Sequence, residues 1–321
     1  MTTRKAFVTG GAGFVGSALV RQLSNNGWQV RVYDALNPGK QDFLPKNAAN
    51  IDLCVGNILD ETHVEQAISE FTPEVVFHLA AIHYIPYCNA HPLETMRVNV
   101  EGTESVLRAC RAASVPRVVF ASTAAVYPAH TGPLHESLTA SPLDIYGYTK
   151  LFGEQLVEWH QQQTKCSAVI ARLFNVYGPR ETSQHLIPQL LEQLVQGTEE
   201  ILVGNIEPKR DYVYVDDIAR ALYDLAEMAH EHSDRLFRVN IGTGTEYSVR
   251  EVLEALQQIT DRRINIVQDP ARVRPSDRPN LCADVSTLRS LIGWTPSTDF
   301  HQGLTDLLEW TVNRKAELVV A

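Results

Sequence analysis

Tyr146 and Lys150 are the residues of this chain whose types and spacing most directly suggest chemistry. Four residues make about one helical turn, so both side chains project from one face of a predicted helix. A tyrosine with its ordinary pKa of about 10 is neutral near pH 7. A lysine ammonium held beside it favours the phenolate, and the pair therefore predicts a general base. The same spacing also arises by chance, so other features must support this interpretation.

A glycine-rich loop, TGGAGFVG at residues 9–16, could bind a dinucleotide. It follows a predicted strand and opens a predicted helix, with Gly11, Gly13 and Gly16 in the Gly-x-Gly-x-x-Gly pattern. Glycines allow a tight turn and close approach of a pyrophosphate, which the helix N-terminus attracts. Asp34 ends the next predicted strand, where a carboxylate can accept hydrogen bonds from a ribose. Because that acid would repel a 2′-phosphate, we expect NAD and not NADP.

The elements that must position these residues alternate between strands and helices. Predicted strands lie at 5–9, 28–34, 51–55, 74–80, 117–122 and 167–175, and predicted helices at 14–25, 61–71, 93–113 and 146–163. Repeated strand–helix units indicate an α/β protein with a doubly wound parallel sheet. We expect an NAD-binding domain at 1–175, with segments near 211–243 returning to it, and a smaller mixed α/β substrate lobe at 176–321. In the second half we predict strands at 213–215 and 237–241, a helix at 216–229, and a capping box at 248–251.

Composition narrows the classes of partner. The 321 residues carry a formal net charge of −10, which argues against a nucleic-acid groove because such grooves need basic surface. Five scattered cysteines form no Cys-x-x-Cys, and the eleven histidines show no metal-binding spacing. No apolar run reaches the roughly 18 residues that cross a bilayer. We therefore expect a cytoplasmic protein with no metal, membrane or nucleic-acid partner.

Further motifs identify a family resemblance. Ser122 and Thr123 close the fifth predicted strand, and strand ends of a doubly wound sheet face the ligand crevice. Other matching motifs are His78-Leu-Ala-Ala81, Asn99-Val-Glu-Gly-Thr103, Arg172-Leu-Phe-Asn-Val-Tyr-Gly-Pro179, Arg210-Asp-Tyr212 and Asn240-Ile-Gly-Thr-Gly244. With the glycine loop and the Tyr–Lys pair, the whole chain resembles the extended short-chain dehydrogenase/reductases, specifically the NAD-dependent sugar-nucleotide epimerase/dehydratase family.

The resemblance implies a role for each matching residue. Tyr146 would be the base, Lys150 its pKa modulator and a ligand of the nicotinamide ribose, and Thr123 the hydroxyl partner. The cofactor residues would be Gly10, Gly13, Phe14, Val15, Gly16, Asp34, Asn57, Ile58, Leu79, Ala80, Ala81, Asn99, Ser122, Tyr146 and Lys150. Asn57 departs from the aspartate usual in the family near adenine, because it keeps an acceptor oxygen but loses the charge.

A nucleotide-sugar substrate is implied as well. Arg210 and Arg274 suit a diphosphate because a guanidinium donates two parallel hydrogen bonds to phosphate oxygens, although each could instead form a surface ion pair. The substrate residues would be Thr123, Tyr146, Asn175, His185, Leu186, Arg210, Arg274 and Asp277. The resemblance makes UDP the expected nucleotide and a homodimer, formed by helices 93–113 and 146–163, the expected assembly.

Two alanines favour one reaction of the family. Dehydratases carry Asp-Glu directly after the active-site threonine, and decarboxylases carry a glutamate at the second position; here these positions are Ala124 and Ala125. The remaining set of Thr123, Tyr146 and Lys150 suits 4-epimerisation through a transient 4-keto sugar. Alternatives are a 4-dehydrogenase or 4-ketoreductase with net NAD(H) turnover and, ranked lower, a dehydratase or a non-catalytic NAD-binding regulator. The sugar, whether a hexose, an N-acetylhexosamine or a uronic acid, stays open.

Overall fold

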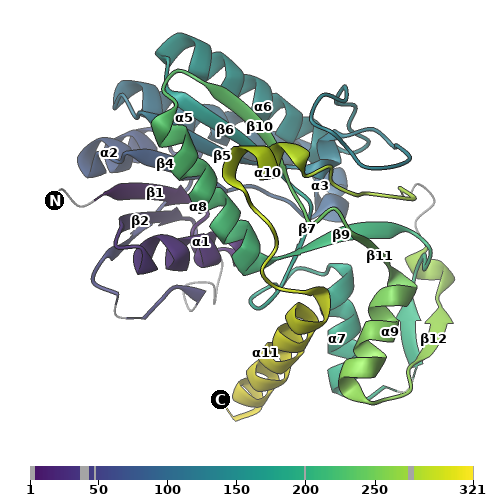
Figure 1. The fold of residues 1–321 in the computed structure, drawn as a ribbon. Helices are drawn as coiled ribbons and strands as arrows, with labels where there is room; N and C mark the ends of the chain where they lie inside the picture. Colours follow the sequence, from purple (N-terminus) through teal and green to yellow (C-terminus); the bar gives the residue numbers. More distant parts are fainter. Residues whose placement is uncertain (1–3, 37–42, 47, 199, 274–277, 321) are drawn as a thin grey trace.

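A seven-stranded parallel sheet forms the centre of the computed structural model, which describes residues 4–36, 43–46, 48–198, 200–273 and 278–320. The strands are β1 (Lys5–Thr9), β2 (Gln29–Asp34), β3 (Ile51–Val55), β4 (Val75–His78), β5 (Arg117–Thr123), β6 (Ser167–Leu173) and β10 (Leu236–Ile241). Their spatial order is β10-β6-β5-β4-β1-β2-β3, drawn in Figure 1. The order reverses direction between β1 and β4, so the predicted doubly wound sheet is confirmed.

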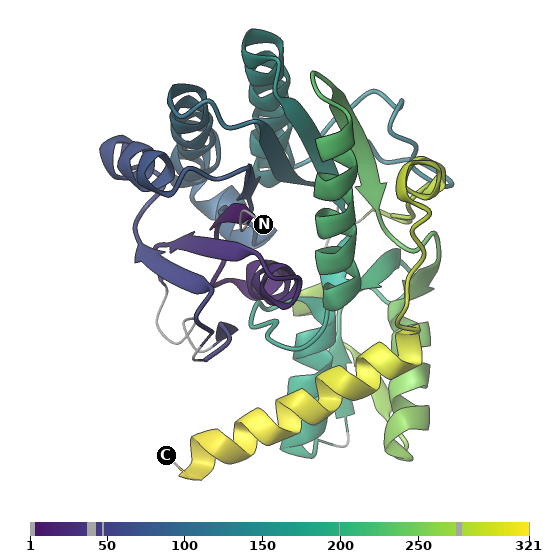
Figure 2. The same cartoon turned by 60° about the vertical axis from the view of Figure 1, so that its left-hand side comes forward.

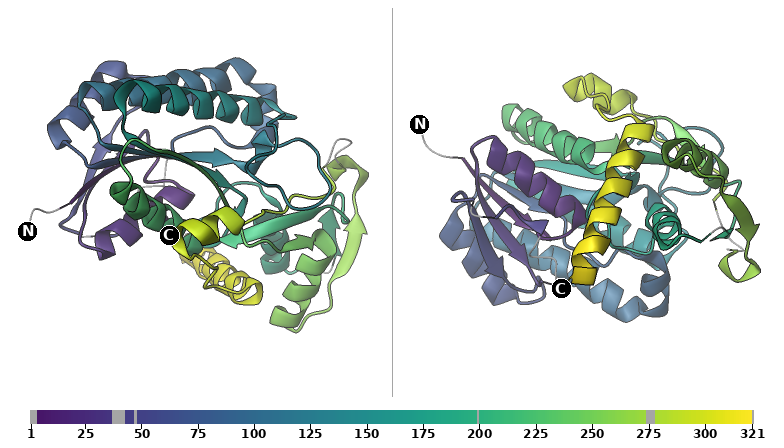
Figure 3. Two further views of the ribbon diagram at one scale, coloured as in Figure 1. Left: turned by 45° about the horizontal axis from the view of Figure 1, so that its top comes forward. Right: turned by 90° about the horizontal axis from the view of Figure 1, so that it is seen from below.

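Helices cover both faces of this sheet, as Figure 3 shows. One face carries α1 (Phe14–Asn25), α8 (Val215–Glu231) and α10 (Ser286–Ile292), and the other carries α2 (Glu61–Phe71), α5 (Gly102–Ala112) and α6 (Ile145–Thr164). All four residues of β4 are buried, as expected of a parallel strand covered on both sides. The apolar residues of β1 and β4 are therefore part of the sheet core.

The predicted helix at 93–113 is interrupted in the structure. It forms α4 (Pro92–Met96), a π-helical turn η2 (Arg97–Glu101) and α5, after a short α3 (Ile85–Ala90). Within η2 the Asn99 amide bonds both backbone groups of Ile82, and a β carbon on Gly102 would lie 2.5 Å from the Ile58 side chain. A π turn inserts one extra residue, and here it directs a buried polar side chain toward a neighbouring loop. Sequence periodicity did not predict this interruption.

A smaller mixed part contains a three-stranded sheet, a two-stranded sheet and three helices. These are β7 (Asn175–Tyr177), β9 (Lys209–Tyr214), β11 (Glu246–Ser248), β8 (Glu200–Val203), β12 (Asn265–Gln268), α7 (Leu186–Gln196), α9 (Val249–Thr260) and α11 (Phe300–Val320). The predicted strand at 167–175 ends at Leu173, because the chain leaves the large sheet there and pairs with β9 as β7. The predicted strand at 213–215 is the end of β9, and α8 begins at Val215.

Local sequence signals fix several ends in this part. The capping box predicted at Ser248 is confirmed: its hydroxyl accepts from the Glu251 N–H, and the Glu251 carboxylate accepts from the Ser248 N–H.

The long helix α11 runs along the lower side of the molecule in Figure 2. β10 pairs in parallel with β6, so this segment lies in the large sheet although it follows β9 in the chain. Among the described helices none is long and apolar enough to cross a membrane.

Candidate functional site

A cavity of about 1240 Å³ lies where the carboxyl ends of the large sheet meet the smaller part. Its volume exceeds the ~300–1,000 Å³ typical of a single small-molecule site, so it has room for a dinucleotide and a second ligand. The predicted residues that line it are Gly10, Gly13, Phe14, Val15, Gly16, Asp34, Asn57, Ile58, Leu79, Ala80, Ala81, Ser122, Thr123, Tyr146, Lys150, Asn175, His185, Leu186 and Arg210. Arg274 and Asp277 lie outside the described residues.

The glycine loop forms a cradle that side chains would fill. Gly10 has a φ of +69°, and a β carbon there would lie 2.7 Å from the Ala80 nitrogen. A β carbon on Gly16 would overlap the Gly10 carbonyl oxygen. Gly13 precedes α1 and offers no capping side chain, so the first N–H groups of the helix have no side-chain acceptor from it. A pyrophosphate fits this arrangement, because it needs close backbone approach and helix N–H donors.

Asp34 lies at the carboxyl end of β2 beside this cradle. Its two oxygens accept hydrogen bonds from the Ala12 and Leu36 N–H groups, at 3.0 and 2.9 Å. The carboxylate thus fixes the glycine loop while lining the cavity where a ribose would lie. Asn57 uses its side-chain oxygen within its own turn, accepting from the Leu59 N–H at 3.0 Å. The acceptor that this asparagine retains therefore stabilises the turn that faces the cavity.

Tyr146 and Lys150 extend from the first turns of α6 into the same cavity as Thr123. Asp144 caps this helix by accepting from the Gly147 N–H at 2.8 Å. Thr123 ends β5, and its hydroxyl accepts from the Ala125 N–H at 3.1 Å, which begins the 3-10 turn η3 (Ala124–Val126). The end of β5 and the start of α6 thus bring Thr123 to the same cavity as Tyr146 and Lys150.

Burial dominates the electrostatics of the Tyr–Lys pair. Burial raises the pKa of Tyr146, while a hydrogen bond with Thr123 lowers it in part. Burial also lowers the pKa of Lys150 to about 7, and Glu154, one turn further along α6, opposes this shift. The Lys150 ammonium lies 4.5 Å from the Phe120 ring centroid. The net pKa of Tyr146 is thus raised in the protein alone, because desolvation disfavours the charged phenolate.

Two predicted cofactor residues use their side chains within the protein. Asn99 is buried and is absent from the described lining of the cavity; its side chain bonds the backbone of Ile82, and its amide also donates to the Thr149 hydroxyl at 3.0 Å. Ser122 donates to Glu154 at 2.5 Å, and Glu154 pairs with Arg172 at 2.7 Å. Asn99 and Ser122 therefore both hold α6 in place through their side chains. The motif match alone could not show whether these side chains contact a ligand or the protein itself.

Arginines from the second half of the chain also line the cavity. Arg210 on β9 donates through Nη1 to the carbonyls of Lys209 and Arg278, both at 2.8 Å. Arg272 and Arg278 also line the cavity, and the sequence prediction missed them. Three arginines within residues 272–278 were an available signal, because arginine is over-represented where proteins bind phosphate groups.

A second cluster that the sequence did not predict surrounds His185. Its Nδ1 lies 2.7 Å from the buried carboxylate of Glu181, whose pKa is raised by burial. His83 Nε2 lies 3.0 Å from the Ser183 hydroxyl, which links two loops that are 100 residues apart in the chain. The contact brings these loops together at the cavity wall.

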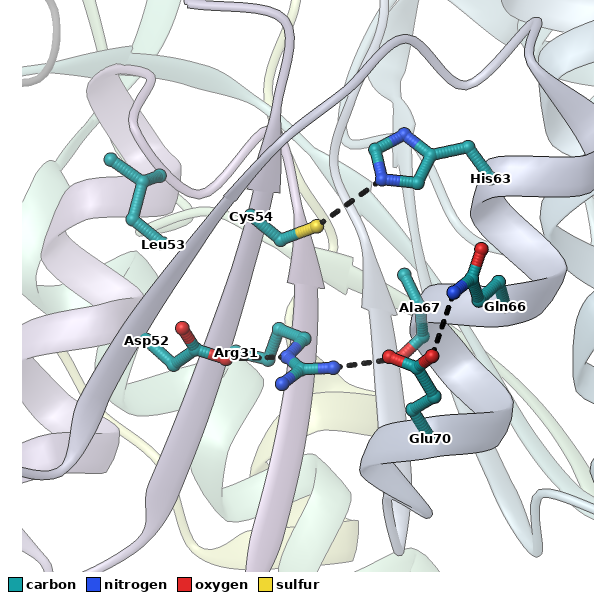
Figure 4. A pocket seen from close by; sticks show the side chains of 8 residues that line it. All are labelled: Arg31, Asp52, Leu53, Cys54, His63, Gln66, Ala67 and Glu70. Carbon is teal, nitrogen blue, oxygen red and sulfur yellow. Dashed lines mark hydrogen bonds and ion pairs between the residues drawn. The ribbon is translucent and has the colours of Figure 1, made fainter.

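A smaller hollow of about 240 Å³ lies between β3 and α2 and is drawn in Figure 4. Within it the Cys54 sulfur lies 3.7 Å from His63 Nε2, and Arg31 bonds Asp52 at 2.6 Å. Burial raises the pKa of the Cys54 thiol, which disfavours the reactive thiolate. Among the described residues no three His, Cys, Asp or Glu side chains gather as a metal site.

The fold and the site together define a dinucleotide-binding α/β protein with a Tyr–Lys centre beside an arginine-bearing second ligand site. Residues 6–242 match the model of the NAD dependent epimerase/dehydratase family. The chain belongs to this family.

Individual relatives cover almost the whole chain. A UDP-N-acetyl-alpha-D-glucosaminuronate decarboxylase of Bacillus cytotoxicus is 29% identical over 96% of this chain and 97% of its own. The crystal structure of UDP-glucose 4-epimerase from Thermotoga maritima with UDP-glucose is 31% identical, with a TM-score of 0.88 over 98% of this chain and 99% of that one. The crystal structure of the Thermus thermophilus UDP-glucose 4-epimerase complex with NAD is 30% identical, with a TM-score of 0.85 over 95% and 98%.

Proposed function

We propose that this protein is an NAD-dependent epimerase that inverts carbon 4 of a nucleotide diphosphate sugar. The observation that carries the proposal is the meeting of Thr123, Tyr146 and Lys150 in one cavity, with alanines at 124 and 125. This set can move one proton, and the neighbouring methyl groups cannot move another. Inversion through a 4-keto sugar needs no further acid or base.

NAD is the proposed cofactor, with its pyrophosphate on the cradle of Gly10, Gly13 and Gly16, and its adenosine ribose at Asp34. When bound, it supplies the reversible hydride acceptor for carbon 4. Phe14, Val15, Asn57, Ile58, Leu79, Ala80, Ala81 and Ser122 line the same end of the cavity and would enclose it. The fit of the cradle and the NAD complex of the Thermus thermophilus relative support this assignment.

Tyr146 is the proposed base for the sugar 4-hydroxyl, and Thr123 is its hydrogen-bonding partner. Lys150 would modulate the pKa of Tyr146 and would bind the nicotinamide ribose. Burial lowers the pKa of Lys150 to about 7, so this amine, one turn beyond Tyr146 on α6, can gain or lose a proton near neutral pH. Such a pair can accept the sugar proton and return it near neutral pH.

The substrate diphosphate would bind at Arg210, helped by Asn175, His185 and Leu186, with Arg274 and Asp277 as further proposed ligands. We propose UDP as the nucleotide, because the Thermotoga maritima relative was solved with UDP-glucose. A diphosphate anchor lets the sugar turn over without leaving the protein. The identity of the sugar, whether a hexose, an N-acetylhexosamine or a uronic acid, is to be determined by assay.

Decarboxylation is the strongest competing reaction, because a relative over the whole chain is a decarboxylase. The site supports it less well: Ala125 stands where the family places its glutamate, and its methyl group cannot transfer a proton. A 4-dehydrogenase or 4-ketoreductase would use the same three residues but would leave reduced or oxidised cofactor behind. A dehydratase would need acids at 124 and 125, and a non-catalytic NAD-binding regulator would not need Tyr146 and Lys150.

We propose that residues 1–175, with the returning elements at 211–243, bind the cofactor and that residues 176–321 bind the nucleotide sugar. A homodimer through α4, η2, α5 and α6 is proposed, and large exposed apolar side chains on α4 and α6 support it. These side chains are Leu93, Met96, Tyr148, Phe152 and Trp159. Five unpaired cysteines support a reducing, cytoplasmic location.

A panel of nucleotide sugars tests this function. Purified protein is incubated with UDP-hexoses, UDP-N-acetylhexosamines and UDP-uronic acids, and products are separated while absorbance at the NADH wavelength is followed. The proposal predicts a 4-epimer with no net NADH. Stoichiometric NADH would favour a dehydrogenase, loss of carbon dioxide would favour a decarboxylase, and no product from any sugar would contradict catalysis.

A further inference from the structure

A connecting segment, residues 278–284, lies between β9 and the loop that follows η3. On one side the Leu281 N–H donates to the Lys209 carbonyl at 3.1 Å, and the Asp211 N–H donates to the Leu281 carbonyl at 2.9 Å. On the other side the Leu134 N–H donates to the Cys282 carbonyl at 2.8 Å, and the Asp284 N–H donates to the Leu134 carbonyl at 3.0 Å. Backbone bonds therefore join this segment to the strand that carries Arg210.

Arg278 extends this connection to the turn after Thr123. Its Nη2 donates to the Ala125 carbonyl at 3.1 Å and its Nη1 to the Ala124 carbonyl at 3.3 Å. The Arg278 carbonyl in turn accepts from Arg210 Nη1 at 2.8 Å. Leu281 and Ala283 of the segment pack in a small buried cluster with Ala124 and Val126 of the same turn, which adds apolar packing to these hydrogen bonds.

The turn itself contacts Thr123 and Gly147, the residue that follows Tyr146. The Thr123 hydroxyl accepts a hydrogen bond from the Ala125 N–H. A shift of Ala125 would therefore displace the group that orients this hydroxyl. A β carbon on Gly147 would lie 2.5 Å from the Ala125 carbonyl oxygen, so η3 packs directly against the residue after Tyr146. The Ala125 carbonyl group thus accepts a hydrogen bond from Arg278 and also packs against the start of α6.

We propose that Arg278 is a positioning residue that couples occupation of the Arg210 site to the alignment of Thr123 and Tyr146. A phosphate held by Arg210 would also fix the Arg278 main chain, and the Arg278 guanidinium would then hold the η3 carbonyls. Hydrogen bonds from a charged donor are about twice as strong as neutral ones, and arginine's fork of donors can hold two carbonyls at once. The inference rests on the proposed function, because it names Arg210 as the diphosphate site.

Kinetics of Arg278→Gln test the coupling. Misplacing reacting groups by about 1 Å can cost on the order of 10²-fold, so we expect kcat to fall about tenfold to hundredfold while KM changes less than about threefold. Thermal midpoint and bound NAD should match the wild type, and Arg278→Lys, with a single ammonium, should restore part of kcat. Arg250→Gln, which removes an exposed ion pair in the same part of the chain, is the control. A folded Arg278→Gln protein with unchanged kcat, or with a raised KM alone, would overturn the proposal.

Hydrogen exchange on the wild type keeps the proposal testable if the variants do not fold. Uridine diphosphate lacks the substrate sugar that a UDP-sugar carries on its outer phosphate, so it can bind without reacting. Its binding should slow exchange of the amides at residues 124–127, although the diphosphate would bind at β9. Unchanged exchange at saturating uridine diphosphate would contradict the coupling. This result is separate from the proposed function: a protein that shows the protection but epimerises no sugar would disprove epimerisation and leave the coupling standing.

Discussion

Tyr146 and Lys150 show how burial can set the chemistry of a residue pair. The sequence placed both side chains on one helix face, but it could not reveal that the cavity wall would exclude water from them. Desolvation raises the pKa of Tyr146 and lowers that of Lys150 to about 7. Near neutral pH Lys150 is therefore the group of the pair that gains or loses a proton, while Tyr146 remains a neutral phenol in the protein alone.

Removing the Tyr146 hydroxyl should abolish most activity. We expect Tyr146→Phe to lower kcat on the order of 10²–10⁴-fold, because a general base contributes about that much. Tyr148→Phe is the matched control, because Tyr148 lies two residues further along α6 and its side chain is exposed. Steady-state kinetics of both variants, with bound NAD measured, decide the matter; near-normal turnover of a folded, NAD-loaded Tyr146→Phe protein would disprove the proposed base.

Lys150→Met should increase stability while it reduces activity. The folded pKa of Lys150, about 7, lies below the ordinary value of 10.5, so between these pH values the unfolded chain binds more protons and wild-type stability rises with pH. The variant should gain roughly 0.5–2 kcal/mol in free energy of unfolding, most at or below pH 7, with the gain shrinking toward pH 10. Urea unfolding at several pH values measures this difference. A variant less stable than wild type at pH 6 would show that the buried charge is not a cost.

The glycine loop is the element whose role depends most on the absence of side chains. We expect Gly16→Ala to lower NAD affinity at least about tenfold, because the new methyl group overlaps the Gly10 carbonyl and must displace the loop. Gly197→Ala is the control: its φ of +80° also strains alanine, but nothing lies within 4 Å of the added carbon. Titration of NAD into both variants measures the effect. Wild-type affinity in a folded Gly16→Ala protein would contradict the cradle.

Sequence patterns predicted elements better than their interruptions. Alternating apolar runs predicted six strands of the large sheet and also the segment at 237–241, because buried parallel strands have continuous apolar sequence. The π turn at Arg97–Glu101 could not be predicted, because its cause is a tertiary contact of Asn99 with Ile82. Arg278 and His83 were missed for the same reason: their partners lie 100 or more residues away. Motif residues with local backbone roles, such as the glycines, were predicted from sequence.

At the scale of the whole molecule, exposed apolar side chains on one helix layer predict self-association. Tyr148 and Phe152 lie one turn apart on α6, and each is 50% exposed. Replacing both with glutamate should convert the proposed dimer to a monomer, because charges buried in an interface without partners are unfavourable. Sedimentation velocity of wild type and variant, with circular dichroism as a folding control, provides the test. A monomeric wild type would contradict the proposed assembly.

We propose that the cavity holds both NAD and a nucleotide sugar, and that a carbon–hydrogen bond is broken and remade there at one sugar carbon. The most direct measurement uses a UDP-sugar deuterated at carbon 4, chosen from the panel, and follows both epimers by mass spectrometry and NMR. We expect the deuterium to stay at carbon 4 of the inverted product, with no solvent hydrogen incorporated and no net NADH formed. Loss of deuterium to solvent, or stoichiometric accumulation of reduced cofactor, would contradict it.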